Sequence, residues 1–269
     1  MSCSENPNTT LRSVLLKLAC TFLVTICHLT RERSTFFPFS PECNDALVDM
    51  VFVVDASTSV TEYNFLVMKD FIKDFLFNAN IDDGNVRVGI IIYSTEDYLQ
   101  FHLNEHKDKL ALFTAIDDIP YRYGSTNTAD ALNTMRTQMY TEANGDRPGV
   151  PNVAIVITDG VSNINSRRTI PEAEQARAEG IHIYAIGIGL TDTTELEGIA
   201  SKPVDENLFS VKEFSELRNL RSKVFTALCA SRCLNVRLIS KIQTRKLKCL
   251  HIINSTISLL PCQGLSDKL

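Results

Sequence analysis

The 269-residue chain contains no tryptophan and lacks the short motifs that mark several classes of enzyme. It has no His-Glu-x-x-His metal motif, no Gly-x-Ser-x-Gly nucleophile turn and no phosphate-binding loop that ends in Gly-Lys-Ser or Gly-Lys-Thr. The pair Gly187 and Gly189 lacks the third glycine of a dinucleotide-binding turn and comes late in the chain. These absences argue against metalloproteases, serine hydrolases, nucleotide hydrolases and dehydrogenases, so we expect a binding protein and no enzymatic activity.

Cysteine is missing from the central part of the chain, between Cys43 and Cys229. Because cysteines stand on both sides of this stretch, we expect a disulfide that joins its two ends, Cys43 with Cys229. Cys233 is an alternative partner, and unrelated free thiols are the remaining alternative. A disulfide implies an oxidising compartment. Asn8 and Asn254 begin glycosylation sequons, which arise often by chance and add little.

The N-terminal apolar run, residues 18–27, is short for a membrane-spanning helix but has the length of a signal-peptide core. Arg12 and Lys17 precede it. We therefore expect residues 1–30 to be a secretory signal and residues 31–46 a linker. Because no clear cleavage site follows the run, a retained signal anchor at the cell surface is the alternative.

Negative charge is concentrated in the centre of the chain and positive charge near its end. Residues 44–230 carry 16 Lys and Arg against 28 Asp and Glu, a net charge of −12, whereas six cations and no anion lie between Arg232 and Lys248. The acidic centre argues against nucleic-acid binding by that part of the chain. Residues 231–269 have no clear period and are expected to be a basic tail or the start of another module. Such a tail could contact acidic polysaccharide or anionic lipid, or simply be solvated.

Between residues 47 and 230, apolar segments typical of buried strands alternate with segments of helical spacing. The expected strands are 49–55, 86–93, 99–103, 153–158, 181–187 and 208–211, and the expected helices are about 65–76, 110–119, 126–143, 171–179, 194–200 and 211–228. This alternation predicts an α/β fold: a doubly wound, mostly parallel six-stranded sheet with one antiparallel edge strand and helices on both faces. Ligands of such sheets bind beyond the carboxyl ends of the strands.

Three short polar segments follow expected strands or open an expected helix, and their side chains suit a hard divalent cation. Asp55, Ser57 and Ser59 leave the first strand at alternate positions, Thr126 opens a helix, and Asp159 ends another strand. Magnesium prefers oxygen ligands and keeps several waters, so three hydroxyls and two carboxylates fit it; manganese and calcium are alternatives. The ordinary alternatives are that the hydroxyls cap helices and that the aspartates only begin turns.

The Asp-x-Ser-x-Ser run, Thr126 and the segment Thr158-Asp159-Gly160 together resemble the metal-ion-dependent adhesion site of von Willebrand factor type A domains. Residues 87–89 before 93–94, residues 183–189, residues 195–196 before 199–200 and the closing Cys229 match as well. The resemblance covers residues 47–230 and is greatest to the A domains of matrix proteins such as matrilins and non-fibrillar collagens. Ala56 stands where that group often has glycine, a departure that the small alanine should tolerate.

The resemblance implies a role for each site residue. Ser57 and Ser59 would ligate the metal directly, Thr126 directly or through water according to the state of the site, and Asp55 and Asp159 largely through water. A Glu or Asp of a partner protein would complete the coordination shell.

The resemblance also implies a secreted or surface-exposed protein of the extracellular matrix that binds collagen or another matrix component through a metal-bridged acidic side chain. Tyr121, Tyr123, Arg167 and Arg168 lie on loops that should flank the site and are candidate ligand contacts, with a solvated loop as the alternative. A different hypothesis is a structural module that self-associates or organises a matrix, in which the metal only stabilises the fold.

Overall fold

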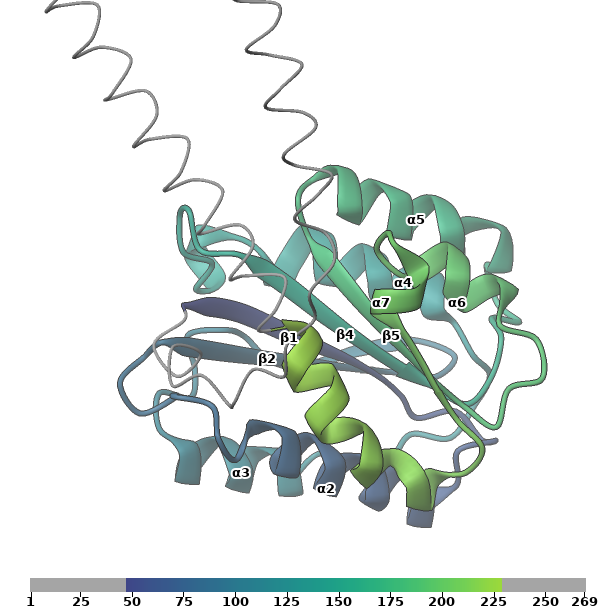
Figure 1. Ribbon diagram of the computed structural model, residues 1–269, viewed down its shortest axis with the longest axis horizontal. Helices are drawn as coiled ribbons and strands as arrows, with labels where there is room; N and C mark the ends of the chain where they lie inside the picture. Colours follow the sequence, from purple (N-terminus) through teal and green to yellow (C-terminus); the bar gives the residue numbers. More distant parts are fainter. Residues whose placement is uncertain (1–46, 229–269) are drawn as a thin grey trace, which may run out of the picture. The chain divides into compact units, whose positions relative to one another are not determined.

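The computed structural model describes residues 47–228, which form a central sheet between two layers of helices (Figure 1). The expected signal, linker, basic tail, disulfide and sequons lie outside the described residues. Within residues 47–228, no helix is both long and apolar enough to cross a membrane.

The sheet has six strands in the order β3-β2-β1-β4-β5-β6. The neighbours of β1 are β2 and β4, both parallel to it; β5 and β6 continue the parallel sheet, and β3 pairs antiparallel with β2 at one edge. The strand bounds are Val48–Asp55 (β1), Val86–Tyr93 (β2), Asp97–Phe101 (β3), Asn152–Thr158 (β4), His182–Ile188 (β5) and Leu208–Val211 (β6). The predicted architecture, including the antiparallel edge, is confirmed.

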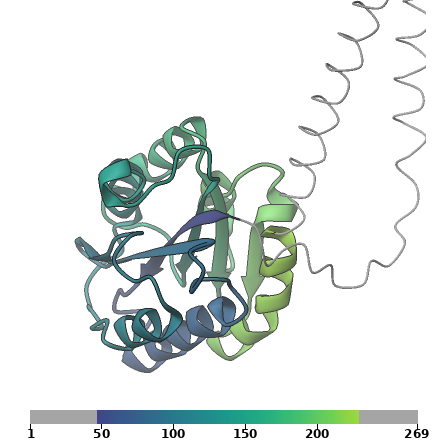
Figure 2. The ribbon, with the colours of Figure 1, turned by 90° about the vertical axis from the view of Figure 1, so that its left-hand side faces the viewer.

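Helices cover both faces of this sheet, and Figure 2 shows the two layers from the side. One layer contains α2 (Glu62–Leu76), α3 (Lys109–Asp117) and a final helix over residues 217–228; the other contains α4 (Thr128–Thr134), α5 (Ser166–Ala178) and α6 (Thr194–Ile199). The short α7 (Val204–Asn207) precedes β6. Helices on both faces are the usual consequence of parallel strands joined by helical crossovers.

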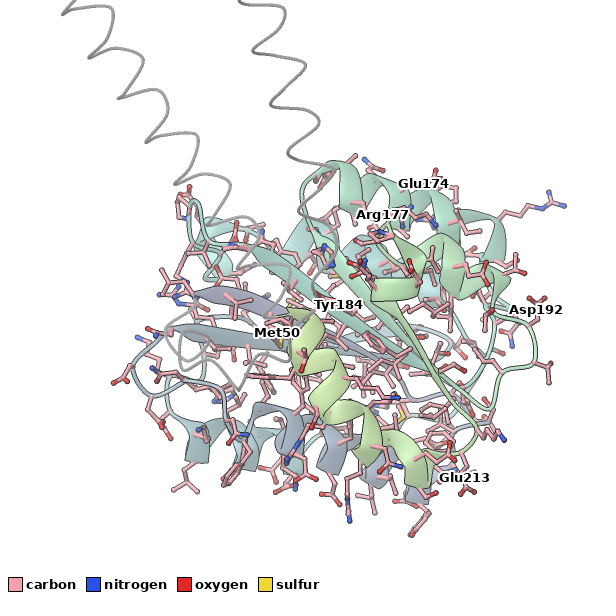
Figure 3. The ribbon with its side chains drawn as sticks, viewed as in Figure 1. Met50, Glu174, Arg177, Tyr184, Asp192 and Glu213 are labelled. Atoms are coloured by element: carbon pink, nitrogen blue, oxygen red, sulfur yellow. The ribbon has the colours of Figure 1, made fainter. Side chains whose placement is uncertain are left out.

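Every residue of β1 is buried, because its alternate side chains enter two different cores. Phe52 and Val54 belong to the core under α2, α3 and the final helix, whereas Val51 and Val53 belong to the core under α4, α5 and α6. Met50 and Tyr184, labelled in Figure 3, lie in the first of these cores. This burial on both faces explains why the residues between the two aspartates of β1 are all apolar.

Three predicted helices differ from the structure by five residues or more. The helix expected over residues 211–228 begins at residue 217, after a 3-10 turn, Phe214–Glu216. The helix expected over residues 126–143 ends as an α-helix at Thr134 and continues as a π-helical turn, Met135–Met139, and a separate 3-10 turn, Glu142–Asn144. The helix expected from Pro171 begins five residues earlier, at Ser166. Pro171 is the sixth residue of that helix, so it lies in the second turn and removes one helical N–H donor.

Candidate metal centre

The polar residues expected to bind a metal lie at the carboxyl edge of the sheet, where β1 and β4 are neighbours. The chain leaves β1 toward β2 on one side and reaches β4 on the other, so the edge between β1 and β4 is the topological switch point of the sheet. Asp55 is the last residue of β1, and Asp159 directly follows β4. The strand pairing thus brings together two aspartates that are 104 positions apart in the sequence.

The first of three loops at this edge holds Asp55, Ser57 and Ser59. One Asp55 carboxylate oxygen accepts a hydrogen bond from the Ser57 amide at 2.8 Å, and the other accepts one from the Thr158 hydroxyl at 2.6 Å. The hydroxyls of Ser57 and Ser59 are 3.1 Å apart, and the Ser59 hydroxyl donates to the Asp159 carboxylate at 2.8 Å. Four of the five predicted ligands therefore form one hydrogen-bonded group.

The second loop carries Thr126 and is bonded to the first loop through Thr58. The Thr58 amide donates to the Gly124 carbonyl at 2.9 Å, and the Gly124 amide donates to the Thr58 hydroxyl at 2.9 Å. Gly124 has a φ of 140°, and a Cβ there would lie 2.5 Å from the Thr95 hydroxyl, so glycine is required at this position. Thr126 is buried, and its hydroxyl makes no hydrogen bond to a described residue.

The third loop, after Asp159, is bonded to the second loop through Asn163. The Asn163 side-chain oxygen accepts from the Thr126 amide at 2.9 Å, and the amides of Asn163 and Ile164 both donate to the Thr126 carbonyl. On its other side this loop is held by Glu195 of α6, whose carboxylate accepts from the amide and the hydroxyl of Ser162 at 2.8 and 2.9 Å. The three loops are thus joined by paired hydrogen bonds.

Helix capping does not account for the hydroxyls of the site. The N-cap of α2 is Thr61, and the N-cap of α4 is Asn127, each accepting from the amide three residues later. Ser57, Ser59 and Thr126 therefore do not serve as the caps of these helices, and that alternative from the sequence is wrong.

Without a bound cation, the ionised forms of the two carboxylates of the site are disfavoured. The pKa of Asp55 is raised from an ordinary value of 3.8 to about 6, mainly because the carboxyl is buried. Hydrogen bonds from Thr158 and Ser57 lower this pKa, and the neighbouring Asp159 carboxylate raises it. Burial also raises the pKa of Asp159, opposed by its bond from Ser59. A divalent cation would reverse both shifts, because it stabilises the charged form of each carboxylate.

The donor set fits a hard divalent cation. Three hydroxyls and two carboxylates supply oxygen only, which suits magnesium, manganese or calcium better than softer metals. Within the described part of the chain, no group of three or more His, Cys, Asp or Glu residues is placed to hold a metal. The candidate site therefore depends on hydroxyl oxygens and carries at most two negative charges.

The four candidate ligand contacts differ in their surroundings. Tyr123 is 79% exposed, and Arg167 is exposed and makes no side-chain bond within residues 47–228. The Tyr121 hydroxyl instead donates to the Ser57 carbonyl at 2.9 Å, and its ring packs on Phe65.

Arg168, like Tyr121, differs from the expectation of a side chain that is free to contact a ligand. Its guanidinium forms ion pairs with Asp130 and Glu172, and its side chain is 50% exposed. Both Tyr121 and Arg168 thus have partners inside the domain, which leaves Tyr123 and Arg167 as the more available of the four.

Three residues that join the loops were not singled out as site residues by the sequence: Thr58, Asn163 and Glu195. The two serines at alternate positions, Ser57 and Ser59, drew attention to ligation, whereas the hydroxyl of Thr58 between them accepts a hydrogen bond from the Gly124 amide of the second loop. Asn163 and Glu195 act on residues 37 and 33 positions away, and such pairings cannot be read from local spacing.

Comparisons with known proteins agree with this architecture. The family model of the von Willebrand factor type A domain matches residues 49–223. The chain is 35% identical over 195 residues to the collagen alpha-4(VI) chain of Mus musculus, covering 71% of this chain and 8% of that protein. It is 33% identical over 191 residues to matrilin-2 of Mus musculus, covering 70% and 20%. The chain thus spans a small part of the length of these relatives.

A solved structure shares the fold as well. Proximal thread matrix protein 1 from the mussel byssus superposes with a TM-score of 0.65 at 30% identity, covering 69% of this chain and 48% of that one. A further structure of that protein, described as having a zinc-occupied MIDAS motif, superposes with a TM-score of 0.64. From the matched family model, the strand order and these relatives, we conclude that the chain belongs to the von Willebrand factor type A domain family.

Proposed function

We propose that the chain is an extracellular matrix protein that binds a protein ligand, collagen or another matrix component, through a divalent cation at Asp55, Ser57, Ser59, Thr126 and Asp159. One observation carries the proposal: five oxygen-bearing side chains from three loops lie at one switch point with only two carboxylates among them. The relatives support the setting, since they include a collagen chain, matrilins and a thread matrix protein. The zinc named for one structural relative supports a metal at this site.

The charge of the site supports adhesion over simple structural binding of the metal. A magnesium ion held by neutral hydroxyls and two carboxylates would remain electron-poor and could accept a carboxylate oxygen from a partner. Ser57 and Ser59 would bind the ion, and Asp55 would orient Ser57 through the bond to its amide. Thr58 and Asn163 would hold Thr126 in place through its loop backbone. This arrangement uses the carboxylates for the ion and leaves no free general base, which supports a non-enzymatic function.

The exposed side chains on the loops of the candidate metal centre indicate what kind of ligand segment would fit there. Tyr123 is 79% exposed, and Val161, next to the third loop's Ser162, is 50% exposed. Arg167 adds a positive charge that has no partner within residues 47–228. These side chains suit a ligand segment in which apolar residues accompany the acidic one, because aromatic and Arg side chains are favoured in interface cores.

The direct test is binding of the full chain to collagens and other matrix proteins in magnesium and then in EDTA. We expect binding that EDTA abolishes and that magnesium or manganese restores. The substitution Asp159→Ala should abolish binding, because it removes one of the two carboxylates of the site.

A matched control is Asp205→Ala, which removes the same charge from an exposed position on α7. We expect this variant to bind like the unmodified chain. Binding that survives both EDTA and Asp159→Ala would contradict metal-bridged adhesion and would favour the structural alternative, in which the metal only stabilises a self-associating module.

A further inference from the structure

Arg122 lies on the second loop of the candidate metal centre, between two residues that are bonded to the first loop. On one side of it, the Tyr121 hydroxyl donates to the Ser57 carbonyl at 2.9 Å. On the other side, Gly124 exchanges two hydrogen bonds with Thr58, both 2.9 Å long. The backbone of Arg122 is therefore held close to the loop that carries three of the five candidate ligands.

The side chain of Arg122 is held in place by an aromatic ring. Its guanidinium carbon lies over the ring of Tyr98, 4.9 Å from the ring centroid. Tyr98 is the second residue of β3 and pairs with Ile92 of β2, and the next residue of β2, Tyr93, pairs with Asp55 of β1. Tyr98 thus lies at the edge of the sheet that carries the metal centre, and so does the guanidinium above it.

The guanidinium keeps its capacity to bind an anion. Arg122 is exposed, and it forms no ion pair or side-chain hydrogen bond to any residue within 47–228. Contact with the ring restricts where this long side chain moves, while none of its five N–H donors is used by a described residue. Arg168 differs, because its guanidinium is already paired with Asp130 and Glu172.

The charge of the surroundings gives Arg122 a decisive position for an acidic ligand. Residues 44–230 carry a net charge of −12, and Glu96 and Asp97 directly precede the ring that holds the guanidinium. One acidic side chain of a ligand would be attracted by the metal ion. A second acidic side chain would be repelled by the domain unless a cation met it. Arg122 is placed to be that cation.

We propose that Arg122 is a specificity-determining residue of the metal centre, which binds a second carboxylate of the ligand beside the one that reaches the metal. The ligand class that follows is a matrix-protein segment with two Asp or Glu residues close together. The guanidinium would hold the second carboxylate through two parallel N–H bonds, the geometry that Arg favours. This inference rests on the proposed function, because the first carboxylate requires the metal.

The test uses the full chain and pairs of synthetic peptides, made in linear and in collagen-like triple-helical form. Both peptides of a pair carry one Glu among apolar residues; a nearby second position is Glu in one peptide and Gln in the other, and this position is moved along the series. In magnesium, we expect at least one two-Glu peptide to bind about fivefold more tightly than its Gln partner, as for an exposed charge pair. EDTA should abolish the binding of both.

Three variants assign this preference to the guanidinium. Arg122→Ala should bind the two peptides of a pair equally, and Arg122→Lys should keep only part of the preference, because lysine retains the charge without the two parallel donors. Tyr98→Leu should also reduce the preference, because it removes the ring that holds the guanidinium. Circular dichroism checks that each variant is folded.

The matched control is Lys107→Ala, which removes the same charge from an exposed position near the opposite edge of the sheet. Lys107 lies two residues before Lys109, whose amide donates to Asp82 in the turn before β2. We expect this variant to keep the full preference for the two-Glu peptide. An equal loss of preference in Lys107→Ala and Arg122→Ala would show a net-charge effect and overturn the inference.

The remaining outcomes separate this inference from the proposed function. Magnesium-dependent binding without a preference for any two-Glu peptide, or with the same preference in Arg122→Ala, would overturn the inference and leave metal-bridged adhesion intact. An absence of magnesium-dependent binding to every peptide would count against metal-bridged adhesion, and against this inference with it.

Discussion

The two carboxylates of the site determine how the domain responds to pH. Asp55 is buried, with its pKa raised to about 6, and Asp159 beside it also has a raised pKa. A proton on either carboxylate therefore removes negative charge that favours a bound divalent cation. The metal binds the ionised form, so the affinity for metal should depend on pH in the range where Asp55 titrates.

We predict that magnesium binds about tenfold more weakly at pH 5 than at pH 7, because Asp55 with a pKa of about 6 is then mostly protonated. Titration calorimetry at the two pH values measures this difference. An affinity that is unchanged between pH 7 and pH 5 would contradict the pKa of Asp55.

The metal-free domain should show the opposite trend in stability. The pKa of Asp55 in the folded state lies above its unfolded value of 3.8, so the folded state binds the proton more tightly. The free energy of unfolding in EDTA should therefore rise by about 1 kcal/mol between pH 7 and pH 5 relative to an Asp55→Asn variant. Urea unfolding of both proteins tests this, and an equal pH dependence in the two would count against the prediction.

Asn163 is predicted to position Thr126 without touching the metal. Its side-chain oxygen accepts from the Thr126 amide at 2.9 Å. Asn163→Ala should weaken magnesium binding by about tenfold, a typical loss when a residue that orients a metal ligand is removed. Its effect on the melting temperature in EDTA should be small, because Asn163 is exposed.

The control for this prediction is Ser166→Ala, in the same segment, whose hydroxyl makes no bond to a described residue. It should leave the magnesium affinity unchanged. Loss of magnesium affinity in both variants would show that the segment tolerates no substitution. An unchanged magnesium affinity in Asn163→Ala would contradict the proposed role of Asn163 in positioning Thr126.

At the scale of single residues, the sequence pointed to the candidate ligands, whose metal binding stays a prediction, but not to the residues that hydrogen-bond to their loops. Asp55, Ser57 and Ser59 stand close together in the chain, Thr126 lies two residues before α4, and Asp159 directly follows β4. Their position could therefore be inferred from strand order. The bonds of Asn163 to Thr126 and of Glu195 to Ser162 arise only when the loops fold over one edge.

At the scale of elements, Arg147 joins the starts of three strands at the edge opposite the metal site. Arg147 lies just before β4 and forms an ion pair with Asp49 of β1, whose side chain is fully buried. It also donates to the carbonyls of Gly84 and Asn85, just before β2, and of Val48. One side chain thereby fixes the amino ends of the three central strands.

We predict that Arg147→Ala lowers the free energy of unfolding by about 3 kcal/mol, because it leaves the buried Asp49 charge without its partner. Urea unfolding measures the change. Arg167→Ala, at an exposed arginine that has no partner among the described residues, should change stability by less than about 0.5 kcal/mol. A loss that is similar in both variants would contradict this role of Arg147.

The strands were easier to predict than the helix ends. β1, β2 and β4 are buried over almost their whole length and consist mainly of apolar residues, and their bounds differ from the expected ones by at most one residue. The α4 segment kept its apolar spacing past Thr134, although the backbone changes to a π-helical turn. The start of α5 was missed because Ser166, Arg167 and Arg168 are exposed and carry no apolar period.

At the scale of the whole molecule, metal binding should stabilise the fold that forms the site. The five candidate ligands come from three loops that are far apart in the unfolded chain, so the ion would bind the folded state alone. Magnesium at one hundred times its dissociation constant would add about 2.7 kcal/mol to the free energy of unfolding.

The most direct test of the account is titration calorimetry of magnesium into the metal-free full chain, with Asp159→Ala and Asp205→Ala as paired variants. The account predicts one magnesium site per chain, which Asp159→Ala removes and Asp205→Ala retains. Equal binding by the two variants would place any magnesium elsewhere. No binding by the unmodified chain at millimolar magnesium would contradict a metal centre at the switch point of the sheet.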